Sequence, residues 1–262
     1  MESFRSALNS AGRLPAPQAE TALRDLLRTH SPLPPVEEGN LRYALALSLL
    51  HQHKNEEARD MLEKAVQLLE GAGTGLALAM TALARVELLC NDREKSLDTG
   101  RKALTLLKKN LAPDDARMAP SLFSLSFAEY ESRQLDRAEK LCLEAKKLWE
   151  SQRGPESLEV STCLNNLGRI YEEMGREEEG IAHHEAALAI RRKVLGDNPE
   201  TAFSMGNLGT ALAAAGKWKE AAEMLEEAIA CYARCGHDSG NDIDGYRRNL
   251  NICRQALADQ RA

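Results

Sequence analysis

Residues that build β-sheets are scarce in this sequence. It contains only 6 Ile, 5 Val and eleven aromatic residues among 262, and strands favour these residue types. A large sheet is therefore excluded. Leu and Ala instead number 40 and 38, and both rank high in helix propensity. The composition predicts an all-α protein whose core consists mainly of Leu and Ala.

The sequence also lacks the marks of nucleic-acid-binding, membrane and exported proteins. Acidic residues outnumber basic ones by 40 to 34, which gives a net charge of -6, whereas a nucleic-acid binder is expected to have a basic face. The uncharged apolar-rich runs, such as residues 43–50, are shorter than the roughly 20 residues that span a bilayer. The first residues do not resemble a secretory signal. We therefore expect no nucleic-acid partner and no membrane partner.

Cysteine usage agrees with a cytoplasmic location. The cysteines are spread through helical patterns rather than grouped at spacings typical of a disulfide framework, which favours reduced thiols. They are Cys90, Cys142, Cys163, Cys231, Cys235 and Cys253.

A set of positions recurs along the chain at intervals of 38–42 residues, which is typical of proteins made of stacked structural units. One column holds leucine, at Leu45, Leu83, Leu125, Leu167, Leu208 and Leu250. The next position is small, at Ala46, Ala84, Ser126, Gly168 and Gly209. Two more columns are small, at Ala58, Ser96, Ala138, Gly180 and Ala221, and at Ala65, Ala103, Ala145, Ala187 and Ala228.

Each unit is predicted to be a pair of helices joined by a short turn. Small side chains let neighbouring helices approach closely, and a unit that cannot bury its own apolar face must stack on the next. We expect one elongated domain with an N-terminal capping hairpin over 1–38 and a C-terminal capping helix over 244–262. The repeats between them are predicted over 39–76, 77–118, 119–160, 161–201 and 202–243.

At these columns the sequence resembles the tetratricopeptide repeat in the long form typical of kinesin light chains. The fourth unit carries the resemblance best, at Leu164, Leu167, Gly168, Tyr171, Gly180 and Ala187. The interval of about 42 residues, rather than the common 34, favours the long form. The resemblance implies a right-handed α-solenoid whose first helices line a concave face that binds an extended peptide.

Few patterns point to catalysis or to a cofactor. The glycine-rich stretch 71–75 lacks the preceding strand and the lysine of a phosphate-binding loop. The adjacent histidines at 183–184 point about 100° apart on a helix and therefore cannot share a metal ion. His184 falls in a packing column of the repeat, and we expect it to be a packing residue. Cys231, Cys235 and His237 are close enough in sequence for a metal or redox cluster, although small thiols in a packing face are the simpler interpretation. We expect no enzyme, no cofactor and no metal.

Aromatic side chains are predicted to lie on the concave face. With the repeated leucine counted as position seven of its helix, positions five, six, nine and twelve turn away from the core columns. Phe123, Phe127 and Tyr130 occupy three of these positions in the third unit, and Tyr43 occupies position five in the first. Exposed aromatic residues are frequent anchors of protein interfaces. The alternative is that this stripe belongs to the core.

Polar residues recur on the same predicted face. Asparagine can donate to and accept from a peptide backbone, and the resemblance implies this role at position six. Arginine at position nine could hold a partner's carboxylate. The alternatives are asparagines that brace adjacent helices and arginines in solvent. The polar candidates are Arg85, Asn165, Asn166, Arg169, Asn207 and Asn249.

The leading hypothesis is a non-enzymatic adaptor that binds a protein or peptide segment in its groove. The alternative is a peptide-sensing regulator whose superhelix changes shape on binding. The sequence does not identify the partner or the oligomeric state.

Overall fold

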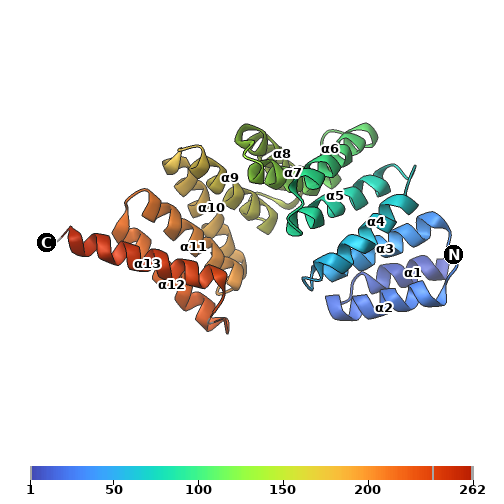
Figure 1. The fold of residues 1–262 in the computed structure, drawn as a ribbon, viewed down its shortest axis with the longest axis horizontal. Coiled ribbons are helices and arrows are strands. Elements are labelled where there is room, and N and C mark those ends of the chain that lie inside the picture. Colours follow the sequence, from blue (N-terminus) through green and yellow to red (C-terminus); the bar gives the residue numbers. More distant parts are fainter. Residues whose placement is uncertain (1, 238, 261–262) are drawn as a thin grey trace. The chain divides into compact units, whose positions relative to one another are not determined.

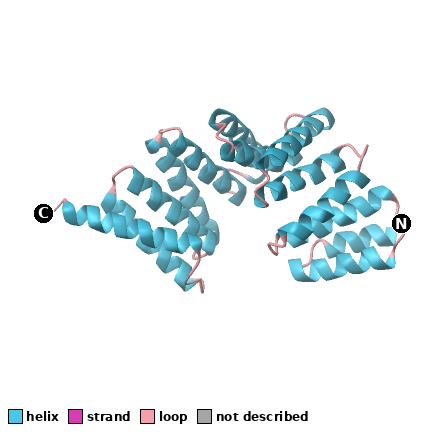
Figure 2. Ribbon diagram, viewed as in Figure 1, coloured by secondary structure: helices cyan, strands magenta, loops and turns pink. Residues whose placement is uncertain are grey.

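The structure, a computed structural model, describes residues 2–237 and 239–260. Within these residues the chain forms thirteen α-helices and one short 3-10 helix, and no strand occurs among them (Figures 1 and 2). The all-α fold class is thereby confirmed. Among the helices described, none combines the length and the apolar character needed to cross a membrane.

The chain divides into two compact units, which we call unit 1, residues 1–134, and unit 2, residues 135–262. The division lies at the turn inside the predicted third repeat, although the sequence shows no linker there. In unit 1 the helices are α1 (Glu2–Ala11), α2 (Ala16–Thr29), α3 (Pro35–Leu50), α4 (Asn55–Leu68), α5 (Thr74–Leu89), α6 (Arg93–Asn110), a 3-10 turn (Ala116–Met118) and α7 (Ala119–Glu131). In unit 2 they are α8 (Leu135–Arg153), α9 (Leu158–Glu173), α10 (Glu177–Leu195), α11 (Pro199–Ala214), α12 (Trp218–Arg234) and α13 (Asn241–Asp259).

Helices that are consecutive in sequence pack as antiparallel hairpins within each unit. The hairpins are α3 with α4 and α5 with α6 in unit 1, and α9 with α10 and α11 with α12 in unit 2. Residues 2–29 form a further helical hairpin from α1 and α2. Each hairpin also contacts the next hairpin of its unit, as the stacking of repeats requires.

The small-residue columns lie where paired helices touch. A Cβ on Gly168 of α9 would come within 2.5 Å of the His184 ring on α10. In the next hairpin a Cβ on Gly209 would lie 2.7 Å from Cγ of Leu225. Any larger side chain would push these helices apart, which is the physical reason for the repeated small residues.

Helices α3 and α11 begin slightly before the predicted repeat boundaries. Helix α11 begins at Pro199 rather than at 202, because Asn198 accepts a hydrogen bond from the Glu200 N–H and proline fits the first helical turn. Helix α3 likewise begins at Pro35 rather than at 39. The predicted boundaries followed the buried columns, whereas the helices begin at their capping residues.

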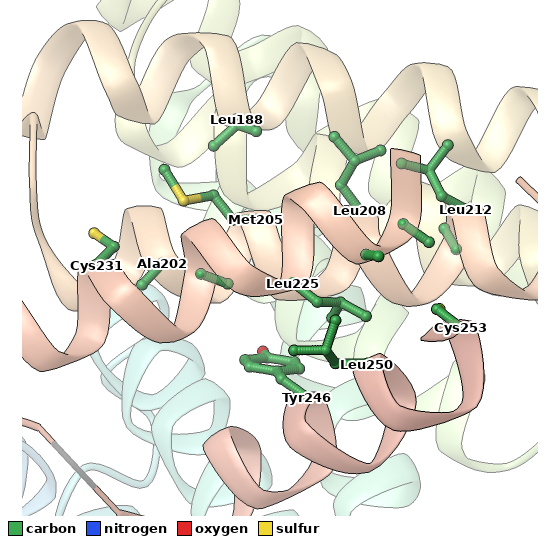
Figure 3. Close-up of a cluster of buried hydrophobic side chains, with 14 of the residues drawn as sticks. Leu188, Ala202, Met205, Leu208, Leu212, Leu225, Cys231, Tyr246, Leu250 and Cys253 are labelled. Atoms are coloured by element: carbon green, nitrogen blue, oxygen red, sulfur yellow. The ribbon is translucent and has the colours of Figure 1, made fainter. Parts of the chain in front are cut away.

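A large apolar cluster fills the end of unit 2 (Figure 3). Met205, Leu208 and Leu212 of α11 pack there with Leu225 of α12 and Leu250 of α13. Burial of such side chains contributes about 1.5–3 kcal/mol each. This cluster holds α11, α12 and α13 in fixed positions.

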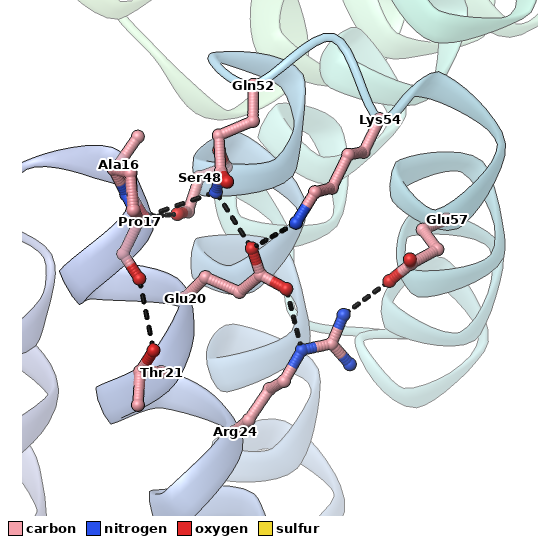
Figure 4. A network of polar contacts seen from close by, with 9 residues as sticks. All are labelled: Ala16, Pro17, Glu20, Thr21, Arg24, Ser48, Gln52, Lys54 and Glu57. Atoms are coloured by element: carbon pink, nitrogen blue, oxygen red, sulfur yellow. Dashed lines mark hydrogen bonds and ion pairs between the residues drawn. The ribbon is translucent and has the colours of Figure 1, made fainter.

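A polar network ties α2 to α3 and α4 in unit 1 (Figure 4). The Glu20 carboxylate accepts hydrogen bonds from Lys54 at 2.7 Å and from Gln52 and Arg24 at 2.9 Å each. Arg24 also pairs with Glu57 of α4. The hydrogen bond from Lys54 is the largest cause that lowers the pKa of Glu20, to about 2.

Candidate functional site

Three asparagines lie at equivalent positions on successive first helices of unit 2. We call Asn166 of α9, Asn207 of α11 and Asn249 of α13 the asparagine row. Helix α11 packs against both α9 and α13, so the three helices that carry the row are neighbours. Asn166, Asn207 and Asn249 are all half-buried.

The amide groups of the row have different hydrogen-bonding states. Nδ2 of Asn249 donates to Oγ1 of Thr210 at 3.1 Å, which braces α13 against α11. Nδ2 of Asn207 is shielded from solvent and has no hydrogen-bond acceptor among the described residues. An enclosed donor without an acceptor costs free energy. The chain therefore holds an unsatisfied donor in the middle of the row.

The spacing between the last two members of the row is set by a glycine and a tyrosine. A Cβ on Gly206 of α11 would come within 2.0 Å of the Tyr246 ring. Tyr246 is 6% exposed, and its hydroxyl donates to the Phe203 carbonyl at 3.5 Å. The ring therefore lies directly against the α11 backbone beside Asn207. This contact fixes α13, and with it Asn249, relative to α11.

Asn165 does not belong to this surface, which corrects its predicted placement. Its side chain is 4% exposed, and Oδ1 lies 2.7 Å from Nδ1 of His184. His184 is fully buried, as predicted for a packing residue. Position five of α9 therefore faces the paired helix, because the glycine at 168 lets the histidine ring enter the hairpin.

A buried arginine that sequence reasoning missed connects α10 to both neighbouring first helices. Arg191 is 5% exposed, and its guanidinium donates to Ser204 Oγ at 2.8 Å and to Ser161 Oγ at 3.2 Å. It also donates to the Glu200 carbonyl at 3.1 Å. Burial lowers the pKa of Arg191, but hydroxyl and carbonyl oxygens satisfy its donors. Arg191 thus fixes α9 relative to α11, and with them Asn166 relative to Asn207.

Arg169 lies on α9 one turn beyond Asn166 and is half-buried. Its distance of three residues from Asn166 places it on the same face of the helix. Arg85 is exposed on α5 of unit 1. The two arginines share a repeat position but belong to different units.

The predicted aromatic stripe lies on α7 of unit 1. Phe127 and Tyr130 are stacked, with ring centroids 6.3 Å apart and an interplanar angle of 14°. Both rings and that of Phe123 are half-buried. Leu122 and Leu125 of the same helix are buried, as expected for core columns. The stripe is therefore a partly accessible surface beside the core.

Tyr43, which was predicted to lie on the groove, is half-buried against the core. Its ring packs against two buried clusters of unit 1, which contain Leu45 and Leu69 respectively. Burial raises the pKa of Tyr43. The first repeat therefore uses position five for packing, as the fourth does at Asn165.

The cysteine and histidine side chains near 231–237 do not converge. Cys231 is fully buried, and its thiol faces the Asn198 carbonyl at 3.8 Å. The ring of His237 instead lies 3.0 Å from the Cys235 carbonyl. No group of three or more histidine, cysteine or acidic side chains able to hold a metal ion occurs in the part of the chain that the structure describes.

The sequence is similar to a known repeat family and to a kinesin light chain-related protein. Residues 117–179 and 168–234 match the tetratricopeptide repeat family. Over 204 residues the chain is 24% identical to Protein KINESIN LIGHT CHAIN-RELATED 2 of Arabidopsis thaliana. This match covers 76% of the chain but only 30% of the relative. The chain thus spans less than a third of the length of that protein.

Two solved structures share the fold over most of the chain. BtubC (BKLC) from P. vanneervenii has a TM-score of 0.68 at 20% identity, covering 91% of this chain and 94% of its own. A Rap protein complexed with Competence and Sporulation Factor has a TM-score of 0.72 at 17% identity, covering 98% and 75%. At these identities the likeness concerns the fold alone, and the predicted solenoid of stacked helical hairpins is confirmed.

Proposed function

Because the chain carries tetratricopeptide repeats and resembles kinesin light chains, we propose that it is a protein-interaction scaffold. In this proposal it has no enzymatic role, and the asparagine row binds an extended segment of a partner protein. The unsatisfied Nδ2 of Asn207, on the helix between those of the other two asparagines of the row, is the observation that carries the proposal.

The row binds mainly the backbone of the partner segment. An extended peptide presents an N–H and a C=O at each residue, and asparagine side chains can pair with both groups. The carbonyl oxygen of Asn249 is available for a partner N–H, because its hydrogen bond to Thr210 uses only Nδ2. Nδ2 of Asn207 is shielded from solvent, so the half-buried side chain must turn its amide outward before a partner carbonyl supplies the acceptor that it lacks. Arg169 adds preference for an acidic side chain near Asn166.

The fixed geometry of the row favours binding. The Gly206–Tyr246 contact and the Arg191 hydrogen bonds hold the three first helices before any partner arrives. A surface that is already ordered loses little conformational freedom on association. On unit 1, the stacked Phe127 and Tyr130 provide a second contact region that is suited to apolar side chains.

Peptides selected from a phage-displayed random library against the intact chain test the proposal. A selected peptide is compared with a copy methylated at its backbone nitrogens. We expect methylation to weaken binding by about tenfold or more, since each lost hydrogen bond contributes about 1 kcal/mol. The triple variant Asn166→Ala, Asn207→Ala and Asn249→Ala should weaken binding to a similar extent.

The matched control is Asn251→Ala, an exposed asparagine of α13 outside the row. It should bind the selected peptide as the unaltered chain does. Equal affinities for the triple variant and the unaltered chain would show that the row is not the binding surface. Melting curves of all variants establish that any loss is not caused by unfolding.

A second candidate function is that of a peptide sensor. The Rap protein with a similar fold was crystallised with Competence and Sporulation Factor, and solenoids rely on contacts between neighbouring repeats, which permits changes of pitch. Small-angle scattering with and without a selected peptide distinguishes the two functions. A sensor should change its radius of gyration, whereas a rigid scaffold should not.

A further inference from the structure

A hollow lies between α1 and α3 of unit 1, and α2 forms its floor. It consists of two adjoining cavities of about 460 and about 560 Å³, which share Gly12 and Ala44. Helix α2 packs against both α1 and α3. We call this space the N-terminal hollow. Its size is that of pockets that enclose small ligands or a few side chains.

The walls of the N-terminal hollow are largely apolar. Leu8 of α1 and Leu47 of α3 line opposite sides and are half-buried, and Leu23 of α2 is buried at the floor. Ala44 also lines the hollow, and its small side chain leaves the space open. Ala44 and Leu47 occupy the repeat positions that hold Asn166 and Arg169 in unit 2. The same helix face is therefore apolar here.

The hollow is held open by fixed contacts between α2 and α3. Ser48 Oγ donates to the Ala16 carbonyl at 2.6 Å, and both residues line the hollow (Figure 4). Glu20 binds Gln52 and Lys54 on the same side of α2. The floor and the α3 wall thus form one ordered surface.

The α1 side of the hollow is basic. Arg5 and Arg13 line it with Asn9 between them, and all three side chains are exposed. Neither guanidinium forms an ion pair with any residue for which the structure gives a side chain. The lining contains no acidic residue, although acidic residues outnumber basic ones in the chain by 40 to 34. A cavity that combines apolar walls with two guanidinium groups is complementary to an acidic ligand with an apolar part.

From this complementarity we propose that the N-terminal hollow binds a short acidic segment of a partner protein. Two carboxylates pair with Arg5 and Arg13, and an apolar side chain between them enters the space over Ala44. Arg5 lies within α1 and Arg13 lies in the turn two residues after its end at Ala11, so a rise close to the helical 1.5 Å per residue puts their backbones roughly 12 Å apart. An extended chain covers this distance in about three to four residues. The segment therefore has two acidic residues at that spacing, with leucine-like residues between them.

Each contact of the proposed complex has a physical cause. Guanidinium and carboxylate groups form paired, charge-assisted hydrogen bonds. The apolar side chain covers Leu8 and Leu47, which removes apolar surface from water. This site uses no residue of the asparagine row, so its occupation is independent of the function proposed above.

Fluorescence anisotropy with a synthetic peptide tests the proposal on the intact chain. The probe is a fluorescein-labelled decapeptide with two glutamates that flank three leucines, and its control has glutamines in place of the glutamates. We expect the acidic peptide to bind at least about tenfold more tightly, with an affinity that falls as salt is added. Equal binding of both peptides would overturn the proposal.

Two variants locate the binding. The double variant Arg5→Gln and Arg13→Gln should lose about tenfold or more in affinity. A matched double variant, Arg28→Gln and Lys64→Gln, changes two exposed basic residues outside the hollow and should bind normally. Ala44→Phe fills the hollow without changing its charge and should also abolish binding. Equal loss in both double variants would show nonspecific attraction and contradict the proposal.

Two further measurements distinguish a peptide site in the hollow from a small-anion site and from binding in unit 2. Competition by free succinate at the peptide's concentration would show a small-anion site and overturn the assignment to a protein segment. The asparagine-row triple variant should retain full affinity for the acidic peptide, and loss of affinity there would place the peptide in unit 2. Circular dichroism checks that each variant is folded.

Discussion

Nδ1 of His184 lies 2.7 Å from Oδ1 of Asn165, and the two side chains are enclosed between α9 and α10. The neighbouring Asn166 is half-buried on the outer face of the same helix. Adjacent asparagines of one helix therefore have different tasks, one inside the hairpin and one on the proposed binding surface.

This difference gives a paired prediction. Asn165→Ala should destabilise the chain by about 1–3 kcal/mol, because it leaves a buried ring nitrogen without its partner. Asn166→Ala should change the free energy of unfolding by less than about 0.5 kcal/mol, as is usual for surface substitutions. Chemical denaturation measures both values, and a selected peptide measures affinity. Only Asn166→Ala should weaken peptide binding, and the reverse pattern would contradict the placement of the two residues.

The buried leucine column provides a test of the packing. Leu167 is fully buried on α9, so Leu167→Ala should cost about 2–5 kcal/mol in the free energy of unfolding. Leu143→Ala on α8 is the control, since Leu143 is 41% exposed and its truncation should have little effect. A cost below about 1 kcal/mol for Leu167→Ala would mean that the repeat register is misplaced.

Glu87 on α5 is a buried carboxyl group whose removal should stabilise the fold. It is 6% exposed, its Oε2 has no hydrogen-bond partner, and burial raises its pKa above the ordinary value of 4.5. A raised pKa in the folded chain means that stability falls as the pH increases above 4.5, because the folded state then holds a charge in an unfavourable place. Glu87→Gln should therefore raise Tm by about 2–4 °C at pH 7.

The pH dependence is the control for the Glu87 prediction. Below pH 4 the carboxyl group is protonated in both folded and unfolded chains, and the advantage of Glu87→Gln should disappear. Thermal melts at pH 7 and pH 4 measure the difference. An equal gain at both pH values would show that charge is not the cause.

For Glu20 we expect the opposite effect of substitution on stability. Its pKa is lowered from 4.5 to about 2, chiefly by the hydrogen bond from Lys54. A lowered pKa stabilises the folded chain above pH 4.5, and this contribution is lost as the pH falls through about 2. Glu20→Gln should lower Tm at pH 7, and its deficit should shrink as the pH approaches 2. The network joins α2 to α3 and α4. At pH 7 a protease should therefore cleave the Glu20→Gln variant between α1 and α3 sooner than it cleaves the unaltered chain.

The repeat architecture could be predicted because its cause is visible in single residue types. A close helix contact requires a small side chain, and so Gly168 and Gly209 mark the contact directly in the sequence. The helix starts were less predictable, since Pro35 and Pro199 begin helices before the first buried column. Asn166, Asn207 and Asn249 share position six of their helices, which can be read directly from the alignment of the repeats.

The side-chain directions at position five could not be predicted in the same way. Asn165 turns inward because His184 enters the hairpin opposite it, and Tyr43 is half-buried because two apolar clusters meet beside it. Both depend on what the packed neighbour offers. The N-terminal hollow depends in the same way on how α1 and α3 lie on α2, and no column of the repeat encodes this arrangement. The bracing role of Arg191 is hard to see in the sequence. Its partners Ser161 and Ser204 are distant from it in the chain and come together around it only in the folded structure.

The contact between Gly206 and the Tyr246 ring also predicts how this chain and its relatives diverge. The ring lies where any side chain at 206 would begin, so neither position can change freely while the other stays the same. Sequences that gain a side chain at 206 should carry a small residue at 246, and sequences that keep the aromatic ring should keep glycine. The two positions, 40 residues apart, should therefore change together in evolution and appear as a covarying pair.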